Sequence, residues 1–465
     1  MDPENITIAY IGGGSRNWAL KLMADLALER EIGGELRLYD IDGKAALHNE
    51  GLGRALFSRP ESGGRFRVRA VDTAAGALGG ADFVVMSIEP GPIEARKGDL
   101  VVPLEHGILQ TVGDTVGPGG LLRALRALPV MADYATLVME LCPDAWVINY
   151  TNPMSLCLAA MYEAAPGLRA YGCCHEVFSI QKKLADLIAR ADSVPAPPRS
   201  EIDLEFAGLN HFTLATRASW KGRDLMALVR EEARTMEPRR DRSARALDRR
   251  SREAWFESDG AIAYDLLSVL GVLGAAGDRH LAEFLPFYFG SEATILSYGV
   301  PPTPFEWRLR EWTRPRPAAA RIAARPVLPS GEEGVAQMKA LAGLGSLRTN
   351  LNLPNHGQWT QVPELAIVET MALIEGEGIS PIKAPNLPQA ALEFERRALA
   401  VQALTLEAAK TRDPDLALQA LLLDPLVRLP PARAEALLRD MLAEAAPWLP
   451  GWRIPGQGRT RARSP

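Results

Sequence analysis

The sequence contains few cysteines, no surplus of positive charge and no long apolar run, and each absence disfavours a class of protein. The four cysteines, Cys142, Cys157, Cys173 and Cys174, are too few for a disulfide framework in 465 residues, which favours a reducing cytoplasm. A formal net charge of −5 disfavours nucleic-acid binding and binding to anionic membranes. No apolar run reaches about 18 residues, so no transmembrane helix is predicted. Residues 1–4 carry no basic segment, so no secretory leader is expected.

The composition is that of a globular protein, with 47% hydrophobic and 23% charged residues, and the length favours two domains. Up to residue 150, short apolar runs alternate with helical patterns, which predicts an α/β fold with a doubly wound parallel sheet. The predicted strands are residues 6–11, 35–39, 82–88 and 146–150. Between the first two, Trp18, Leu22 and Leu26 recur at helical spacing and predict a helix that packs on the sheet.

Glycines crowd the point where the first predicted strand meets the first predicted helix. The run Gly12-Gly13-Gly14-Ser15 lies where a phosphate can approach the unpaired N–H groups of a helix N-terminus. Asn17 takes the place of the third glycine of the usual fingerprint. Asp40 ends the second strand, where a carboxylate can accept hydrogen bonds from ribose hydroxyls and repel a 2′-phosphate. These residues predict an NAD site; a tight turn with Asp40 as a cap is the alternative.

A Pro-rich stretch at residues 195–198 is the best candidate for a domain boundary. Beyond it, residues 202–206 and 212–216 have strand patterns, and the remainder is predicted to be mostly helical, with an arginine-rich surface stretch at 239–253. We therefore predict three segments: an NAD-binding domain over residues 1–195, a mixed α+β catalytic domain over 196–450, and a disordered basic tail over 451–465.

Polar motifs follow the later strands. The run Asn149-Tyr150-Thr151-Asn152-Pro153 ends one strand, and Gly172-Cys173-Cys174-His175 and Gly208-Leu209-Asn210-His211-Phe212 come next. Because ligands bind at the carboxyl edge of open α/β sheets, a thiolate and an imidazole from two strand ends could hold one divalent transition metal. From spacing alone, a small buried cysteine and a hydrogen-bonded structural histidine remain the alternative.

Two further runs belong with these motifs: Gly117-Pro118-Gly119-Gly120 and Asn352-Leu353-Pro354-Asn355-His356-Gly357. Over most of the chain and in the same order, the motifs resemble those of the NAD- and manganese-dependent glycoside hydrolases of family 4. The resemblance implies a Rossmann-like N-terminal domain and a C-terminal α+β substrate and oligomerisation domain, as in malate and lactate dehydrogenases. It also implies a homodimer or homotetramer.

The chemistry implied by the resemblance is hydrolysis of a carbohydrate without net consumption of NAD. The sugar is oxidised at C3 by NAD, a base removes the acidified C2 proton, and Mn²⁺ or another divalent metal stabilises the enediolate before the C1 leaving group departs. The family is an exception to glycoside hydrolysis by two carboxylates.

The resemblance assigns roles to single residues. Cys174 and His211 match the family's metal ligands, whereas Cys173 falls at a variable position and is expected to pack. Asn152 and Arg96 match residues that contact substrate.

Three further assignments concern proton transfer. Asp114 takes the place of an acidic residue that tunes the catalytic base. The base itself is expected at Asp265, with Tyr264 as the near alternative and Asp259 as a more distant one. His175 follows the metal cysteine where phosphoglycosidases often carry Asp, and is the candidate proton donor.

His175 also favours the branch that hydrolyses unphosphorylated α-galactosides, α-glucosides or α-hexuronides such as α-galacturonides. A 6-phosphoglycosidase of the same family, a malate-dehydrogenase-type oxidoreductase and a non-catalytic sensor are the competing interpretations. An oxidoreductase would make net NADH from a hydroxy acid, and a sensor would bind NAD without turnover.

Overall fold

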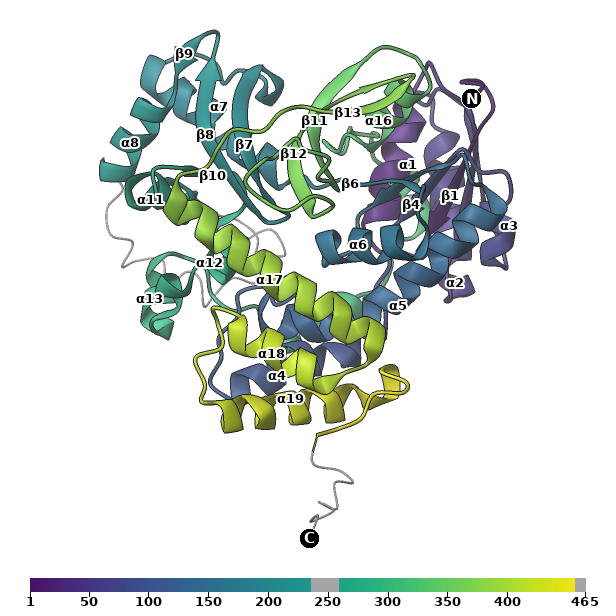
Figure 1. Ribbon diagram of the computed structural model, residues 1–465. Helices are drawn as coiled ribbons and strands as arrows, with labels where there is room; N and C mark the ends of the chain where they lie inside the picture. Colours follow the sequence, from purple (N-terminus) through teal and green to yellow (C-terminus); the bar gives the residue numbers. More distant parts are fainter. Residues whose placement is uncertain (236–258, 456–465) are drawn as a thin grey trace. The chain divides into compact units, whose positions relative to one another are not determined.

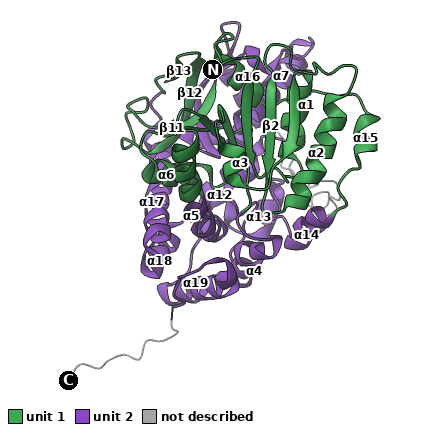
Figure 2. Cartoon of the chain, turned by 90° about the vertical axis from the view of Figure 1, so that its right-hand side faces the viewer, with its two compact units in different colours: residues 1–89, 131–175, 314–384 green, residues 90–130, 176–313, 385–465 purple. Residues whose placement is uncertain are grey.

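The computed structural model describes residues 1–235 and 259–455, so the arginine-rich stretch at 239–253 and the predicted tail beyond residue 455 lie outside the described residues. The chain divides into two compact units, coloured separately in Figure 2. Unit 1 comprises residues 1–89, 131–175 and 314–384, and unit 2 comprises residues 90–130, 176–313 and the chain from 385 onward.

Unit 1 is built on a sheet with helices α1, α2 and α16 among those that cover it (Figure 1). Its elements are β1 (Ile6–Ile11), α1 (Trp18–Leu28), β2 (Gly34–Tyr39), α2 (Gly43–Phe57), β3 (Phe66–Ala70), α3 (Ala74–Leu78), β4 (Phe83–Met86), β5 (Trp146–Asn149), α6 (Met154–Ala164), β6 (Arg169–Gly172), α15 (Ala319–Ala323), α16 (Gly334–Leu341), β11 (Leu347–Pro354), β12 (Ile367–Glu375) and β13 (Gly378–Pro381). The long helix α5 (Gly117–Leu141) begins in unit 2 and ends in unit 1.

The first six strands of unit 1 are parallel and lie in the order β3-β2-β1-β4-β5-β6. That order reverses direction between β1 and β4, where a doubly wound sheet binds its ligand at the carboxyl ends of the strands. The predicted Rossmann-like sheet is therefore confirmed, and the glycine loop after β1 lies at the reversal.

Helix α1 packs on the sheet with the residues that the sequence predicts and with a neighbouring, more deeply buried stripe. Ala19, Met23 and Leu26 are buried, whereas Trp18 and Leu22 are only half-buried. The two stripes are neighbours on a helix, so spacing alone does not separate them. The prediction is confirmed, because Leu26 belongs to the hydrophobic core of unit 1 and Trp18 and Leu22 pack against that core; Trp18 and Leu22 also line a pocket.

Three strands near the C-terminal third, β11, β12 and β13, were missed by the prediction of a mostly helical remainder. They extend the sheet of unit 1 in antiparallel fashion, β11 pairing with β6 and β12. β11 hides its pattern because buried polar residues replace apolar ones: Asn350 donates from Nδ2 to Glu369 on β12, 2.6 Å away. Each buried polar group satisfies the other, so hydrophobic periodicity is lost from the sequence.

The compact units do not coincide with the predicted domains, which divide the chain at residue 195. Residues 90–130 and 176–195 of the predicted first domain fall in unit 2, and residues 314–384 of the predicted second domain fall in unit 1. The physical reason is that β11 pairs with β6 and so returns a late segment to the early sheet. The predicted functional division of the chain stays a prediction.

Unit 2 combines a small antiparallel sheet with helices. Its elements are η1 (Ile93–Ala95), α4 (Arg96–Glu105), α7 (Glu176–Asp192), η2 (Arg199–Glu201), β7 (Ile202–Leu209), β8 (Phe212–Trp220), β9 (Arg223–Asp224), α8 (Met226–Thr235), α11 (Ala261–Val269), β10 (Leu273–Gly274), α12 (Asp278–Phe284), η3 (Pro286–Phe289), α13 (Glu292–Ser297), α14 (Phe305–Thr313), α17 (Gln389–Thr411), α18 (Pro414–Leu423), α19 (Pro431–Ala445) and η4 (Ala446–Trp448). Strand β8 pairs with β7, β9 and β10.

The hairpin of β7 and β8 turns in two residues, because Leu209 pairs directly with Phe212. His211 therefore occupies the turn, with a left-handed φ of 71° that a non-glycine residue rarely adopts. Such strain costs on the order of 1–3 kcal/mol and is found at functional sites. No helix within the described ranges is long and apolar enough to cross a membrane.

Candidate functional site

The glycine run after β1 is required by close backbone approach. Gly12 has a left-handed φ of 94°, and a Cβ on it would lie 2.0 Å from the carbonyl oxygen of Ser87. A Cβ on Gly14 would lie 2.7 Å from the Cβ of Ala45. Any side chain here would push the loop away from α2 and β4, so the run keeps a bare backbone at the N-terminal side of α1.

Asp40 lies where the sequence predicts it, one residue beyond β2 and half-buried. Its Oδ2 accepts a hydrogen bond from the backbone N–H of Gly14 at 2.8 Å, and its Oδ1 accepts from the N–H of Asp42 at 2.9 Å. These bonds tie the carboxylate to the glycine loop. The structure thus brings Gly12, Gly13, Gly14 and Asp40 together in unit 1.

The Asn-Pro motif forms a tied loop after β5. Thr151 donates its N–H to Oδ1 of Asn149 at 2.9 Å, and its Oγ1 accepts from the N–H of Ile88 at 3.1 Å. Asn152, half-buried, precedes Pro153 through a cis peptide bond. The predicted substrate residue therefore sits at the carboxyl edge of the parallel sheet.

The two adjacent cysteines have different surroundings. Cys173 belongs to the hydrophobic core of unit 1, where burial raises the pKa of its thiol to about 12, and Gln337 contacts its Sγ at 3.3 Å. These contacts support the prediction that Cys173 packs. Cys174 is also buried, and its carbonyl oxygen accepts from Nδ2 of Asn350 at 2.9 Å. Cys174 lies in unit 1 and His211 in unit 2.

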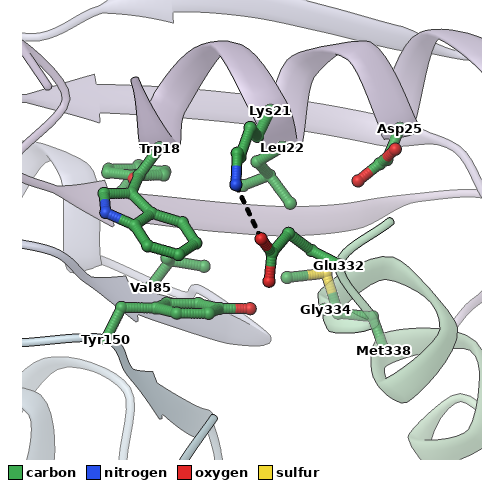
Figure 3. Close-up of a pocket in the computed structure, with 10 residues that line it drawn as sticks. Trp18, Lys21, Leu22, Asp25, Val85, Tyr150, Glu332, Gly334 and Met338 are labelled. Atoms are coloured by element: carbon green, nitrogen blue, oxygen red, sulfur yellow. Dashed lines mark hydrogen bonds and ion pairs between the residues drawn. The ribbon is translucent and has the colours of Figure 1, made fainter. Parts of the chain in front are cut away.

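A pocket in unit 1 encloses about 340 Å³, part of it open to solvent. Figure 3 shows the ring of Trp18 facing the ring of Tyr150, with centroids 5.3 Å apart, while the Nζ of Lys21 meets Glu332 at 2.7 Å. The remaining lining residues are Tyr10, Leu22, Asp25, Val85, Gly334 and Met338. The pocket combines two aromatic walls with one bound pair of charges.

His175 adjoins this pocket. Its ring centroid lies 5.5 Å from that of Trp18, and its Nδ1 lies 3.6 Å from Oε2 of Glu332. Burial alone would raise the pKa of Glu332, but His175 and Lys21 outweigh burial and lower that pKa to about 2. Glu332 is therefore an anion that holds His175 and Lys21 together.

Unit 2 contains a group of three residues that could hold a metal ion: Asp114, His211 and His280. Their ligand atoms all lie within 4.8 Å of one another. Asp114 comes from the loop before α5, His211 from the β7–β8 turn and His280 from α12. One carboxylate and two imidazoles form a donor set that suits Mn²⁺ and other divalent transition metals.

The hydrogen bonds of Thr115 determine which ring nitrogen of His211 can bind a metal. Thr115 donates its single hydroxyl proton to Oδ1 of Asp114 at 2.8 Å, so its Oγ1 must accept from Nδ1–H of His211, also at 2.8 Å. In the neutral ring this leaves Nε2 without a proton. Nε2 can then act as a metal ligand, with Thr115 fixing the tautomer from behind.

Charge around Asp114 keeps it ionised. Burial alone would raise its pKa, but neighbouring imidazole and guanidinium groups, His280 and Arg123 foremost, lower it well below its usual range. The structure thus groups Asp114 with metal-binding side chains; that it tunes a base, as the resemblance implies, stays a prediction. Arg96 opens α4 in the same unit and is half-buried.

The two candidate bases on α11 differ in exposure. Tyr264 is buried, and burial raises the pKa of its hydroxyl well above the usual value. Asp265 is half-buried, and its Oδ2 accepts a hydrogen bond from the hydroxyl of Tyr288 at 2.9 Å. The remaining candidate, Asp259, is exposed. Geometry thus favours Asp265 as the more accessible of the two neighbours, and the identity of the base stays a prediction.

Sequence reasoning missed His280, Glu332 and Thr115. His280 had a signal that could have found it, because the chain has only six histidines and this one follows two charged residues, Asp278 and Arg279. Glu332 and Thr115 had no such signal in the sequence, because the role of each depends on contact with a histidine that is distant in the chain.

Comparison with known proteins places these features in one group. A sequence model of family 4 glycosyl hydrolases matches residues 7–190, and a model of that family's C-terminal domain matches residues 206–427. An α-galacturonidase of Thermoanaerobacterium saccharolyticum is 42% identical over 461 residues, which cover 97% of this chain and 98% of that protein.

Solved structures agree with this grouping. The crystal structure of a putative glucosidase from Bacillus subtilis has a TM-score of 0.85 at 40% identity, covering 94% of this chain and all of that chain. A 6-phospho-α-glucosidase from gut microorganisms, in complex with NAD and Mn²⁺, has a TM-score of 0.75 at 20% identity, covering 97% and 100%. A lactate dehydrogenase from a deep-sea metagenome library has a TM-score of 0.51 at 12% identity, covering 87% of this chain and 99% of that chain. The last two likenesses concern the fold alone, and they agree with the predicted dehydrogenase-like architecture.

Proposed function

The chain belongs to family 4 of the glycosyl hydrolases, and from this membership we propose that it is an α-galacturonidase that hydrolyses unphosphorylated α-galacturonides. The predicted family and the predicted class of reaction, hydrolysis of a carbohydrate glycoside, are confirmed by the two matches. The observation that carries the proposal is the 42% identity to an α-galacturonidase over 97% of the chain.

NAD and a divalent metal fit the residues that are present. The backbone of Gly12 to Gly14 packs too closely on neighbouring protein atoms to carry side chains, so the loop is left with bare backbone, and Asp114, His211 and His280 offer one oxygen and two nitrogen donors. When bound, NAD would exchange hydride with C3 of the sugar, and Mn²⁺ would stabilise negative charge on its C2 and C3 oxygens. The relative that contains both groups supports this pairing of cofactors.

Each predicted residue then has a defined task. Asp40 accepts hydrogen bonds from the ribose of NAD, and Cys174 joins the metal ligands. Arg96 and Asn152 orient the sugar. With NAD at C3 and the metal at the C2 and C3 oxygens, the sugar would be positioned to lose its C2 proton rather than to undergo direct displacement at C1.

Proton transfer is assigned to two side chains that hydrogen bonds or ion pairs hold in place. Asp265 accepts the C2 proton, with the Tyr288 hydroxyl fixing its carboxylate. His175 gives a proton to the leaving group, and Glu332 holds its Nδ1 side. After the leaving group departs, water adds at C1 and the proton returns to C2. The hydride that NAD would have taken from C3 would return to C3, so that no NADH accumulates.

The runner-up is a 6-phosphoglycosidase of the same family. The presence of His175 after Cys174, where phosphoglycosidases often carry Asp, disfavours it. We also propose a cytoplasmic enzyme, because the four cysteines are free thiols, and a homodimer or homotetramer, which the resemblance implies.

A substrate panel tests the assignment. Nitrophenyl α-galacturonide, α-galactoside, α-glucoside and 6-phospho-α-glucoside should be incubated with Mn²⁺, NAD and a thiol reductant. We expect hydrolysis of the galacturonide without accumulation of NADH. Full activity in protein stripped of NAD, or hydrolysis of the phosphorylated sugar alone, contradicts the proposal.

Solvent deuterium tests the route. Because the C2 proton leaves to Asp265 and can exchange with solvent before it returns, hydrolysis in deuterated water should place deuterium at C2 of the product. Asp265→Asn should lower kcat while NAD and metal stay bound, since it removes a base and no ligand. Tyr264→Phe is the matched comparison: a larger loss there than in Asp265→Asn makes Tyr264 the base. Product without deuterium at C2 in the wild type argues for direct displacement at C1.

A further inference from the structure

Four arginines of unit 2 lie close enough to interact electrostatically near its candidate metal group: Arg96, Arg123, Arg279 and Arg308. Burial lowers the pKa of the Arg308 guanidinium well below its usual value, Arg96, Arg279 and Arg123 lower it further, and Asp114 acts in the opposite direction. Like charges crowded in a poorly solvated place are costly unless a ligand or partner compensates them.

Three carboxylates lie near these cations: Asp99, Glu283 and Asp114. Asp99 is committed to a fifth arginine, Arg126, through two hydrogen bonds of 2.7 and 2.8 Å. Burial raises the pKa of Glu283 to about 7, so this group carries only part of a negative charge at neutral pH. Asp114 interacts with Arg123 and Arg308, and it belongs to the group that would hold a divalent cation. A bound metal would therefore add positive charge beside Arg308.

The arginines differ in how far the protein already occupies them. Arg279 is held by backbone and hydroxyl oxygens: Nη1 donates to the carbonyl of Pro301 at 2.8 Å, and Nη2 donates to Thr111 and Thr303. Its side chain is buried, so it acts as a structural cation. Arg279 contributes charge but little free donor capacity.

Arg308 is the opposite case. It lies on α14, which packs against α4, the helix that begins at Arg96. Within residues 1–235 and 259–455 it forms one hydrogen bond, from Nη2 to the carbonyl of Val112 at 2.8 Å, and no ion pair. Its Nε is buried without a hydrogen-bond partner. A guanidinium has five N–H donors, so most of its capacity is unused.

The single bond of Arg308 also places it. Val112 lies two residues before Asp114, in the loop that Glu283 anchors by accepting from the N–H groups of Val112 and Gly113 at 2.8 and 3.0 Å. Arg308 is therefore fixed beside the candidate metal group rather than elsewhere on unit 2. A planar guanidinium with free donors is the group that best matches a carboxylate.

We propose that Arg308, supported by the charge of Arg96, binds the C6 carboxylate of the sugar and so selects uronides over neutral hexosides. This inference rests on the proposed function, because it supplies the anion that an α-galacturonide carries and an α-galactoside lacks. A 6-phosphate is the other anion that could occupy the same position, and the test separates the two.

Arg308→Met removes the guanidinium and keeps an apolar side chain of comparable length, and Arg308→Lys keeps the charge without the fork. Arg310→Met, at an exposed position of the same helix, is the matched control. For each, kcat/KM is measured on nitrophenyl α-galacturonide and on nitrophenyl α-galactoside with Mn²⁺ and NAD. Inhibition by free galacturonate and by galactose is measured alongside, and thermal unfolding checks the fold.

Arg308→Met should lower kcat/KM for the galacturonide about 10- to 100-fold more than for the galactoside, which corresponds to the loss of a charged hydrogen bond. Galacturonate should inhibit this variant more weakly by a similar factor. Arg308→Lys should recover part of both effects, and Arg310→Met should match the wild type. If Arg308→Met does not fold, Arg308→Lys carries the same comparison.

An equal loss on both substrates, or unchanged discrimination in both variants, overturns the assignment of Arg308. A wild type that prefers a 6-phosphogalactoside over the galacturonide also overturns it, because the anion is then a phosphate. A wild type that hydrolyses the galactoside and leaves the galacturonide intact is a failure of the proposed function itself, and it is visible before any variant is made.

Discussion

In the pocket of unit 1, Glu332 meets both Lys21 and His175, at 2.7 and 3.6 Å, whereas in unit 2 Arg308 has one hydrogen bond and no ion pair among the described residues. In the first arrangement the protein's own side chains pair with one another, because Glu332 contacts both Lys21 and His175. The second leaves cations crowded around a candidate metal group. The difference separates charged side chains that the protein pairs with one another from an arginine that we propose to bind the carboxylate of the substrate.

The largest effect is expected at the metal group. His211→Ala removes an imidazole that no neighbour can replace, and His280→Ala removes the second. Each should lower Mn²⁺ affinity and metal-dependent turnover by more than about 100-fold, because even loss of an outer partner of a ligand costs about 10- to 100-fold. Metal content by elemental analysis and kcat on the galacturonide are the readouts.

His106→Ala is the matched control, since His106 pairs with Asp440 in the same unit at 3.0 Å and takes no part in the metal group. A His280→Ala variant that binds Mn²⁺ as tightly as the wild type shows that the three-residue group is not the metal site. Unit 2 could then no longer be contrasted with unit 1 as the metal-binding region.

A smaller loss is expected from Thr115→Val. This change removes the oxygen that accepts from Nδ1–H of His211, so the ring can take the tautomer that protonates Nε2. Mn²⁺ affinity should fall about 10- to 100-fold, while NAD affinity should not change. Calorimetric titrations with Mn²⁺ and, separately, with NAD measure the two affinities. Thr115→Ser, which retains the hydroxyl, should restore Mn²⁺ binding.

In unit 1, Asp40→Ala should weaken NAD binding by about 1–3 kcal/mol, the cost of losing a hydrogen bond to a charged group. Asp40 also holds the N–H of Gly14, so part of this loss reflects a looser loop. Isothermal calorimetry with NAD gives the number, and the exposed Asp72→Ala is the control. Tighter binding of NADP than of NAD by the wild type contradicts the assigned role of Asp40.

The smallest effect concerns Glu332, whose pKa is lowered from 4.5 to about 2 in the folded protein. A lowered carboxyl pKa contributes stability that is present above pH 4.5 and is lost as the pH falls toward 2. Glu332→Gln should therefore lower the free energy of unfolding by about 1–3 kcal/mol at pH 7, and by less at pH 3.

Urea unfolding at the two pH values measures this difference, with the exposed Glu377→Gln as control. An equal loss of stability at both pH values means that Glu332 acts through packing rather than through charge. The ionic contacts of Glu332 with Lys21 and His175 would then not distinguish unit 1 from unit 2.

The sequence predicted the local parts of both regions well. The strand, glycine loop and helix at residues 6–28 and the acidic residue after β2 lie where expected, because near neighbours and backbone sterics decide them. It predicted less well wherever a segment's partner is distant. β11 was missed because its buried Asn350 is satisfied by Glu369, so no apolar pattern marks the strand.

The candidate site divides in the same way. His211 was identifiable from its motif, and its two-residue turn is a local feature of the hairpin. Its companions His280 and Asp114 are far away in sequence, and only the packing of α12 and the loop before α5 brings the three ligand atoms within 4.8 Å. A sequence pattern specifies a residue's chemistry, whereas a shared site also requires distances that arise from long-range packing.

By itself the sequence determined the Rossmann-like parallel sheet, the glycine loop with Asp40, and the membership of the chain in its family, because each rests on short patterns or motifs in a fixed order. Only the tertiary structure decided that Glu332 contacts both His175 and Lys21, and that Arg308 stands beside Asp114 with most of its donors unused. Electrostatic free energy depends on the distances between charges and on their burial. An arginine that stands in no recognisable sequence motif can therefore become a binding residue when folding removes water from around it.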